Sequence, residues 1–251
     1  MERTLNDKNG ADQLRIDQTD SEDRWLEIFS VLVHDIESPL ASMKYLLRLL
    51  EEGRLDTRKP LHHKIVSSTG VAVKRAESII YDIMTIARSG QTGLPVYLET
   101  LAPDEIIDET ILMASGSASE RDINIVRDDG PGGVKVIADP ALLRRTLDNL
   151  LYNAIRHSPS GGEVRLYVSE EPNSLFINVK DSGPGLDDVD PELLFEKYGQ
   201  VKLRTEGRHR GVGLGLYFCK LAATGMGGTV VADDHPEGGA VFSIKLGKAK
   251  E

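Results

Sequence analysis

The feature that most constrains this 251-residue sequence is a long apolar stripe near the N-terminus that repeats with the period of an α-helix. Between Trp25 and Leu50 apolar residues recur at spacings of three and four, so they share one face of an amphipathic helix. A second stripe predicts a helix over residues 61–88, after a short connection at 53–60 that contains Gly and Pro. Two such helices predict an antiparallel hairpin.

A hairpin of two helices leaves much of both apolar stripes exposed to water. Two hairpins packed together would bury all four stripes in a four-helix bundle, which predicts a homodimer. The alternative is that the hairpin packs on the rest of its own chain.

The pattern changes after residues 89–95, where SGQTGLP predicts a break between domains. Beyond this break, short apolar runs alternate with helical patterns, which predicts an α/β layer with its own core. We expect strands at 96–101, 123–127, 134–138, 163–169, 174–181, 228–233 and 240–246, and helices at 103–118, 139–157 and 212–225. The predicted organisation is a polar, disordered linker at 1–21, a helical domain at 22–90 and an α/β domain at 94–248.

Composition excludes several classes of function. The net charge of −10 argues against general binding to nucleic acid. The single cysteine allows neither an internal disulfide nor a multi-cysteine metal site. The sequence shows no signal pattern and no apolar run long enough to span a membrane, so we expect a cytoplasmic protein.

One histidine on the first predicted helix stands out. His34 lies beside the apolar stripe and is followed by Asp35, whose carboxylate could fix the imidazole tautomer and leave the other nitrogen nucleophilic. Pro39 removes a helical hydrogen bond one turn later, so the helix should bend there. A surface histidine on a core helix is the alternative interpretation.

Helix 139–157 of the second domain carries two amides four residues apart. Asn149 and Asn153 should project from the same side, with Arg156 and His157 one turn later. This set suits a hydrated Mg²⁺ with phosphates, although two solvated asparagines would give the same pattern.

A glycine-containing segment, DSGPGL at 181–186, directly follows a predicted strand. Gly183 and Gly185 would let the backbone approach a flat ligand, and Asp181 could accept a hydrogen bond from an exocyclic amine. An ordinary turn could share this pattern.

Two later segments suit an anion. GVGLGL at 211–216 places glycines at the start of a predicted helix, where backbone N–H groups can face phosphate. The preceding stretch, 194–211, is basic in an acidic protein and could close over phosphates, or be a solvated loop.

In order, the segments HDIESPL, NLLYNAIRHS, DSGPGL, LFEKY and GVGLGL resemble the H, N, G1, F and G2 boxes of two-component sensor histidine kinases. The hairpin is similar to the HisKA-type dimerisation and phosphoacceptor domain. The second domain resembles the Bergerat-fold (GHKL) ATP-binding α/β sandwich. The resemblance covers about residues 22–246 and implies a dimeric four-helix bundle followed by that sandwich.

The resemblance also implies residue roles. His34 would accept the phosphoryl group, Asp35 would orient it, and Ser38 would occupy the position that the family links to phosphatase activity. Asn153 would bind Mg²⁺, and Lys197 would approach the γ-phosphate of ATP. The residues implied in nucleotide binding are Asn149, Asn153, Arg156, His157, Asp181, Gly183, Gly185, Phe195, Tyr198, Arg210, Gly211, Val212, Gly213, Leu214 and Gly215.

The activity implied is transfer of the ATP γ-phosphate to His34 and then to an aspartate of a response regulator receiver domain, with weak dephosphorylation of that regulator. Input would come through the short N-terminus, through a separate sensor or upstream partner, or through a missing upstream region. Glu37 and Ser38 depart from the residues usual in the family. Two alternatives follow: a catalytically silent homologue that serves as a dimeric scaffold, and a GHKL ATPase that switches conformation.

Overall fold

The computed structural model describes residues 33, 36–37, 39–92, 94–186, 189–197 and 214–249. These residues form a helical hairpin followed by an α/β layer. Within these residues, none of the helices combines the length and the apolar character that a membrane crossing requires.

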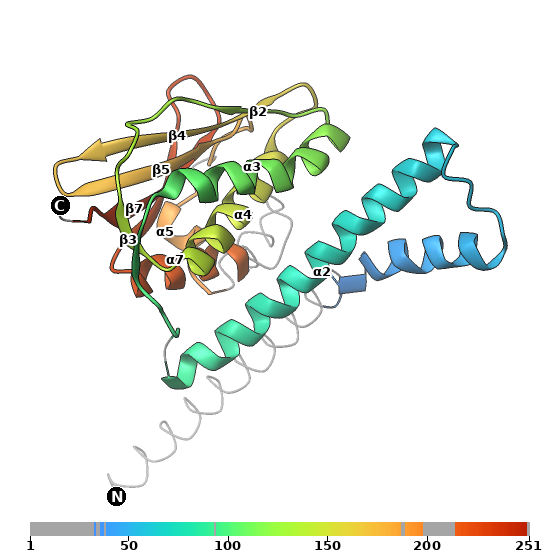
Figure 1. The fold of residues 1–251 in the computed structure, drawn as a ribbon, viewed down its shortest axis with the longest axis horizontal. Helices are drawn as coiled ribbons and strands as arrows, with labels where there is room; N and C mark the ends of the chain where they lie inside the picture. The colour runs from blue at the N-terminus through green and yellow to red at the C-terminus, as the bar shows by residue number, and fades with distance from the viewer. Residues whose placement is uncertain are drawn as a thin grey trace, which may run out of the picture.

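The hairpin consists of a helix at residues 39–51 and the long helix α2, Pro60–Thr92. Gly53 ends the first helix with a φ of +61°, a backbone conformation that favours glycine. The N–H of Arg54 then donates to the carbonyl of Leu49 at 2.9 Å, which satisfies one of the carbonyls left open at the helix end. The two helices return past each other antiparallel, as predicted (Figure 1).

Helix α2 runs four residues past its predicted end at Arg88, into the segment 89–95 that was expected to be a break. The prediction of its end was wrong because the Gly-, Ser- and Pro-containing segment 89–95 was taken as a break from its first residue. A glycine inside a helix costs only about 1 kcal/mol of stability, so a glycine alone does not end a helix. Pro95, by contrast, disfavours the helical conformation of the residue before it. The helix therefore stops closer to the proline.

The second domain is built on a mixed five-stranded sheet in the order β2-β4-β5-β7-β6. The strands are β2 (Asn124–Arg127), β4 (Glu163–Glu171), β5 (Ser174–Lys180), β6 (Thr229–Asp234) and β7 (Ala240–Gly247). Only the β2–β4 pair in this sheet is parallel. A separate antiparallel pair joins β1 (Glu99–Leu101) to β3 (Val136–Ala138).

Three helices lie on one side of the sheet: α3 (Pro103–Glu120), α4 (Pro140–His157) and α7 (Leu214–Gly225), as Figure 1 shows. Alternate residues of β5, namely Leu175, Ile177 and Val179, are fully buried toward them. Asp139 is the N-cap of helix α4, and its carboxylate accepts hydrogen bonds from the backbone N–H groups of Ala141 and Leu142. The α/β sandwich that the sequence predicted is thus confirmed.

A short helix, α5 (Pro191–Leu194), was not predicted. Its signals are present in the sequence, because Asp190 caps the N–H of Glu192 at 3.0 Å and Pro191 occupies the first turn. The helix was missed because four residues are too few to show a helical period.

The single cysteine, Cys219, lies on α7 with no exposed surface. Its thiol donates to the carbonyl of Thr146 on α4 at 3.8 Å. Burial raises the pKa of this thiol well above its usual value.

Candidate functional site

The candidate nucleotide site is organised by Asp181, which follows the last residue of β5 and is 4% exposed. Its Oδ1 accepts hydrogen bonds from the backbone N–H groups of Gly183 at 2.8 Å and Ala240 at 3.0 Å. Burial raises the pKa of this carboxyl, while these two hydrogen bonds act in the opposite direction. The carboxylate is therefore fixed at the end of a central strand.

Glycines allow the backbone to pack closely around this carboxylate. A Cβ on Gly239 would lie 2.0 Å from the carbonyl oxygen of Asp181, and the residue has a φ of +83°. Gly185 also has a positive φ, of +93°. Position 239 thus requires glycine for space as well as for conformation, and position 185 favours it for conformation.

A small hollow of about 40 Å³ opens beside Asp181. It is lined by Asn153, His157, Asp181, Pro184, Gly185, Leu186, Leu194, Leu216, Ala240 and Phe242. The structure therefore brings together Asn153 and His157 of the N-box segment with Asp181 and Gly185 of the DSGPGL segment. Residues 198–213, expected to border the same site, lie outside the described residues.

Phe195 packs against Phe242, which lines this hollow. It follows α5, is 4% exposed, and packs edge-to-face on Phe242 of β7 with ring centroids 6.3 Å apart. Phe195 is therefore a buried anchor for the segment that follows it. Lys197, two residues later, is exposed.

Asn149 does not line this hollow, although it was expected to project on the same side of α4 as Asn153. Its amide donates to the carbonyl of Gly215 on α7 at 3.5 Å, and it is 5% exposed. A larger cavity of about 660 Å³ between α2, α3 and α4 is lined in part by Asn149. Asn149 thus lies between the hollow of Asp181 and the hairpin.

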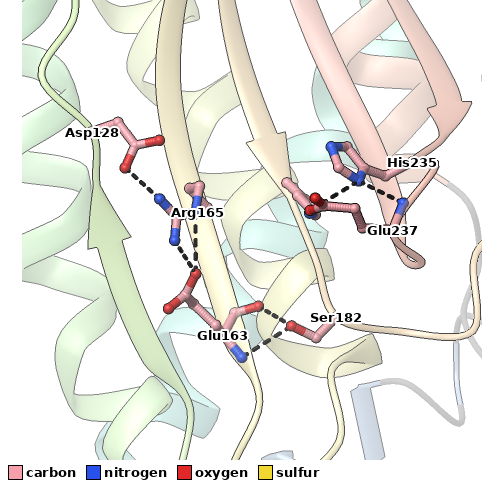
Figure 2. Close-up of polar contacts among 7 residues, drawn as sticks. Asp128, Glu163, Arg165, Ser182, His235 and Glu237 are labelled. Atoms are coloured by element: carbon pink, nitrogen blue, oxygen red, sulfur yellow. Dashed lines mark hydrogen bonds and ion pairs between the residues drawn. The ribbon is translucent and has the colours of Figure 1, made fainter.

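Hydrogen bonds at the start of β4 tie down the rim of the site (Figure 2). The hydroxyl of Ser182 accepts from the N–H of Glu163 at 3.0 Å and also bonds to the carbonyl of the same residue. Arg165 bridges Glu163 and Asp128 with N–O distances of 2.7 and 2.6 Å. The loop that carries Asp181 is thereby attached to β4, and Arg165 ties β4 to Asp128, the residue after β2.

Two family models match the chain. The His Kinase A (phospho-acceptor) domain model matches residues 24–92, and the model of the histidine kinase-, DNA gyrase B- and HSP90-like ATPase matches residues 138–250. The chain belongs to the histidine kinase family.

Individual relatives agree with this assignment. The adaptive-response sensory kinase SasA of Synechococcus sp. (strain JA-2-3B'a(2-13)) is 30% identical over 242 residues, which span 93% of this chain and 61% of that protein. The chain thus spans about six tenths of the length of this relative.

Solved structures also match. The mycobacterial sensor histidine kinase MprB is 27% identical, with a TM-score of 0.52, over 62% of this chain and 100% of the solved one. Histidine kinase ThkA, solved in complex with the response regulator protein TrrA, matches 89% of this chain and 61% of the solved one. Its TM-score is 0.57 and its identity 18%, so this match shows the fold alone.

Arg145 links the hairpin of this chain to the ATPase-like domain. Arg145 of α4 donates to the Oδ1 of Asp82 at 2.7 Å and to the carbonyl of Ser78 at 2.6 Å, both on α2. Its guanidinium also lies 4.1 Å from the ring centroid of Tyr81, which packs edge-to-face on Phe218 of α7. The sequence analysis did not identify Arg145, because its partners lie more than 60 residues away.

The donor set suits a partly hydrated magnesium ion. Within the described residues, no three His, Cys, Asp or Glu side chains gather as ligands. Asn153 instead offers one amide oxygen beside the hollow. Mg²⁺ commonly takes one or two protein oxygens and completes its shell with water and phosphate, so this chain's residues fit it.

Several predicted site residues of this chain fall outside the described residues. They are His34, Asp35, Ser38, Tyr198, Arg210, Gly211, Val212 and Gly213. Leu214 is 5% exposed at the start of α7, next to Gly215. Arg156 lies in the last turn of α4, and its carbonyl accepts from Arg121 at 3.0 Å.

Proposed function

We propose that the chain is an ATP-dependent protein-histidine kinase of a two-component system. It transfers the γ-phosphate of ATP to His34 and then to an aspartate in the receiver domain of a response regulator. Support comes from the two matching family models and from the kinase names of the relatives. The complex of ThkA with a response regulator supports the class of partner.

The observation that carries the nucleotide part is the geometry of Asp181. Both of its hydrogen bonds from described residues end on Oδ1, which leaves Oδ2 to accept from the exocyclic amine of adenine. Gly183 and Gly185 would lie against the base. Phosphates would extend toward Asn153, Arg156 and His157 at the end of α4.

Catalysis in this proposal is mainly positioning and charge neutralisation. Mg²⁺ bound at Asn153 would offset phosphate charge. A ring nitrogen of His34 attacks the γ-phosphorus, the bond from that phosphorus to the ADP oxygen breaks, and ADP leaves. Asp35 holds the N–H of the other ring nitrogen and stabilises the cation that forms. Lys197 would approach the γ-phosphate.

The exposed apolar residues of the hairpin support the proposed homodimer. Side chains on both helices are about half exposed, including Leu47 at 56%, Leu50 at 53%, Ile80 at 52% and Met84 at 49%. A second hairpin would cover them in a four-helix bundle. The proposal keeps the domain limits at 22–90 and 94–248 and a cytoplasmic location. Weak dephosphorylation of the regulator, dependent on Ser38, is also part of it.

The test is incubation of the purified chain with Mg²⁺ and ATP labelled on the γ-phosphate. We expect acid-labile, base-stable label on the protein, which is lost in His34→Gln while ATP binding survives. His63→Gln is the matched control, because His63 is an exposed histidine on α2.

Other outcomes would contradict the proposal. Label that persists in His34→Gln would assign the acceptor to another residue. Release of free phosphate without labelled protein would indicate an ATPase switch, and no turnover at all would indicate a silent scaffold.

A further inference from the structure

Asp234 is the last residue of the edge strand β6, and its side chain reaches across to the loop after β5. Its Oδ1 accepts a hydrogen bond from the backbone N–H of Leu186 at 2.7 Å. The contact with the preceding residue is equally close, because a Cβ on Gly185 would lie 2.5 Å from the same oxygen. The loop therefore lies directly on this carboxylate.

The same loop is held at its other end by Asp181, whose Oδ1 accepts from the N–H of Gly183 at 2.8 Å. The two carboxylates are linked through Ala240 on β7. Ala240 pairs with Asp234 in the antiparallel register, and its N–H donates to Asp181. The turn from Gly183 to Leu186 is thus tied at both ends to one corner of the sheet.

The strand end that carries Asp234 is itself rigidly closed. The N–H of His235 donates to the carbonyl of Gly239 at 2.9 Å, and the N–H of Gly238 donates back to the carbonyl of His235 at 2.8 Å. The Nδ1 of His235 accepts from the N–H of Glu237 at 3.2 Å (Figure 2). Asp234 is therefore presented to the loop from a fixed turn.

Asp234 also acts on Asp181 through its charge. The pKa of Asp181 is raised first by burial and further by the nearby Asp234. Other titratable groups among the described residues around this corner are His157, which lines the hollow, and Asp233 and His235, which flank Asp234 in the chain. Lys180 pairs with Glu237 at 3.2 Å.

We propose that Asp234 is a positioning residue of the nucleotide pocket, which holds the turn from Gly183 to Leu186 in place against the adenine face. This role rests on the proposed function of the site. Asp234 acts through the loop and through Asp181, and it need not touch the nucleotide. No sequence motif indicated it, because its partner lies 48 residues away.

The experiment compares three variants of the full chain. Asp234→Ala removes the hydrogen-bond acceptor, and Asp234→Asn keeps an acceptor oxygen but removes the charge. Asp233→Ala is the matched control, because Asp233 is the exposed neighbour on the same strand and its loss changes the net charge equally. The readouts are hydrogen exchange at the N–H of Leu186 without nucleotide, and ATP affinity as a function of pH.

In Asp234→Ala we expect exchange at Leu186 to become roughly ten- to a hundredfold faster and ATP affinity to fall about tenfold. In Asp234→Asn, the exchange rate at Leu186 and the ATP affinity should both stay close to those of the unsubstituted chain at pH 8. Its affinity should also persist to lower pH, because Asp181 has lost a neighbouring negative charge. A purely structural role of Asp234 would not move this pH profile.

The proposal is overturned if Asp234→Ala matches Asp233→Ala in exchange or in ATP affinity, or if Asp234→Asn is as defective as Asp234→Ala. If the unsubstituted chain binds ATP in these cases, only the role of Asp234 fails. If the unsubstituted chain binds no ATP, the proposed function fails, and the role of Asp234 in nucleotide binding fails with it.

Discussion

Arg145 of α4 and Asp82 of α2 form an ion pair across the joint between the hairpin and the second domain, with an N–O distance of 2.7 Å. The Asp82 side chain is only 3% exposed and that of Arg145 22%. A buried pair of this kind repays its desolvation only when further contacts satisfy both groups. Here Ser78 and the ring of Tyr81 provide such contacts for Arg145.

We expect Arg145→Ala to loosen this joint. Loss of the charged hydrogen bonds should lower the free energy of unfolding by about 1–3 kcal/mol, since Asp82 would remain buried without this partner. Arg144→Ala is the matched control, because Arg144 pairs with Glu109 at an exposed position and such pairs contribute less than about 1 kcal/mol. Denaturant unfolding of both variants measures the difference, and equal losses would contradict the prediction.

Substitutions of the adjacent Gly238 and Gly239 should differ sharply. Both have positive φ, so alanine costs about 1–2 kcal/mol at either position. Only the Cβ at position 239 would overlap the carbonyl of Asp181, whereas nothing lies within 4 Å at position 238. Gly239→Ala should therefore be the less stable variant and also weaken ATP binding. Thermal unfolding and ATP titration of the two variants would show it, and equal behaviour would argue against the close packing.

Asp181→Asn should bind ATP at least about tenfold more weakly while the fold is kept. The N–H groups of Gly183 and Ala240 both need an acceptor at the Oδ1 position, so the new amide would place its oxygen there. Its NH₂ group would then face the adenine amine, donor against donor. Calorimetric titration with ATP provides the measurement, and unchanged affinity would remove Asp181 from the proposed site.

As the pH is lowered, the affinity for ATP should begin to fall at a higher pH than it would if Asp181 had the pKa of an ordinary aspartate. Burial raises the pKa of Asp181, and adenine recognition requires its ionised form. The effect of this carboxyl on the stability of the fold is different. Because its pKa is higher in the folded than in the unfolded chain, its ionisation destabilises the fold as the pH rises from the unfolded-state pKa to the folded-state pKa. The ratio of ATP affinities in the unsubstituted chain and Asp181→Asn, measured from pH 8 to pH 5, isolates this group. A constant ratio would contradict the prediction.

Asn153→Ala should reduce the gain in ATP affinity that Mg²⁺ gives, and leave the affinity measured in a chelator largely unchanged. The physical reason is that the variant removes one amide oxygen beside the hollow and no hydrophobic contact of the core. Titrations with and without Mg²⁺ test this. A loss of equal size in both conditions would assign Asn153 to the nucleotide or to the fold instead.

Much of the fold could be predicted because its elements have local signals. The strand expected at 174–181 is β5 at 174–180, and the helix expected at 139–157 is α4 at 140–157. Close approach at Asp181 could be anticipated from the glycines around it. The contact of Arg145 with α2 could not, because it depends on how two separately predicted units meet.

Asn149 shows the same limit on a smaller scale. Its position four residues before Asn153 correctly placed both on α4, but the period of a helix does not say what lies against each side. The amide of Asn149 donates to the carbonyl of Gly215 on α7 at 3.5 Å, and Asn149 is not among the residues that line the hollow.

The buried thiol of Cys219 makes the chain convenient for site-directed labelling. Because this is the sole cysteine and it has no exposed surface, thiol-reactive probes should not modify the folded protein. The natural sequence can therefore serve directly as the unreactive background. One cysteine introduced at the exposed Leu61 of α2 and another at the exposed Val231 of β6 would carry spin labels that report the distance between the hairpin and the ATPase-like domain.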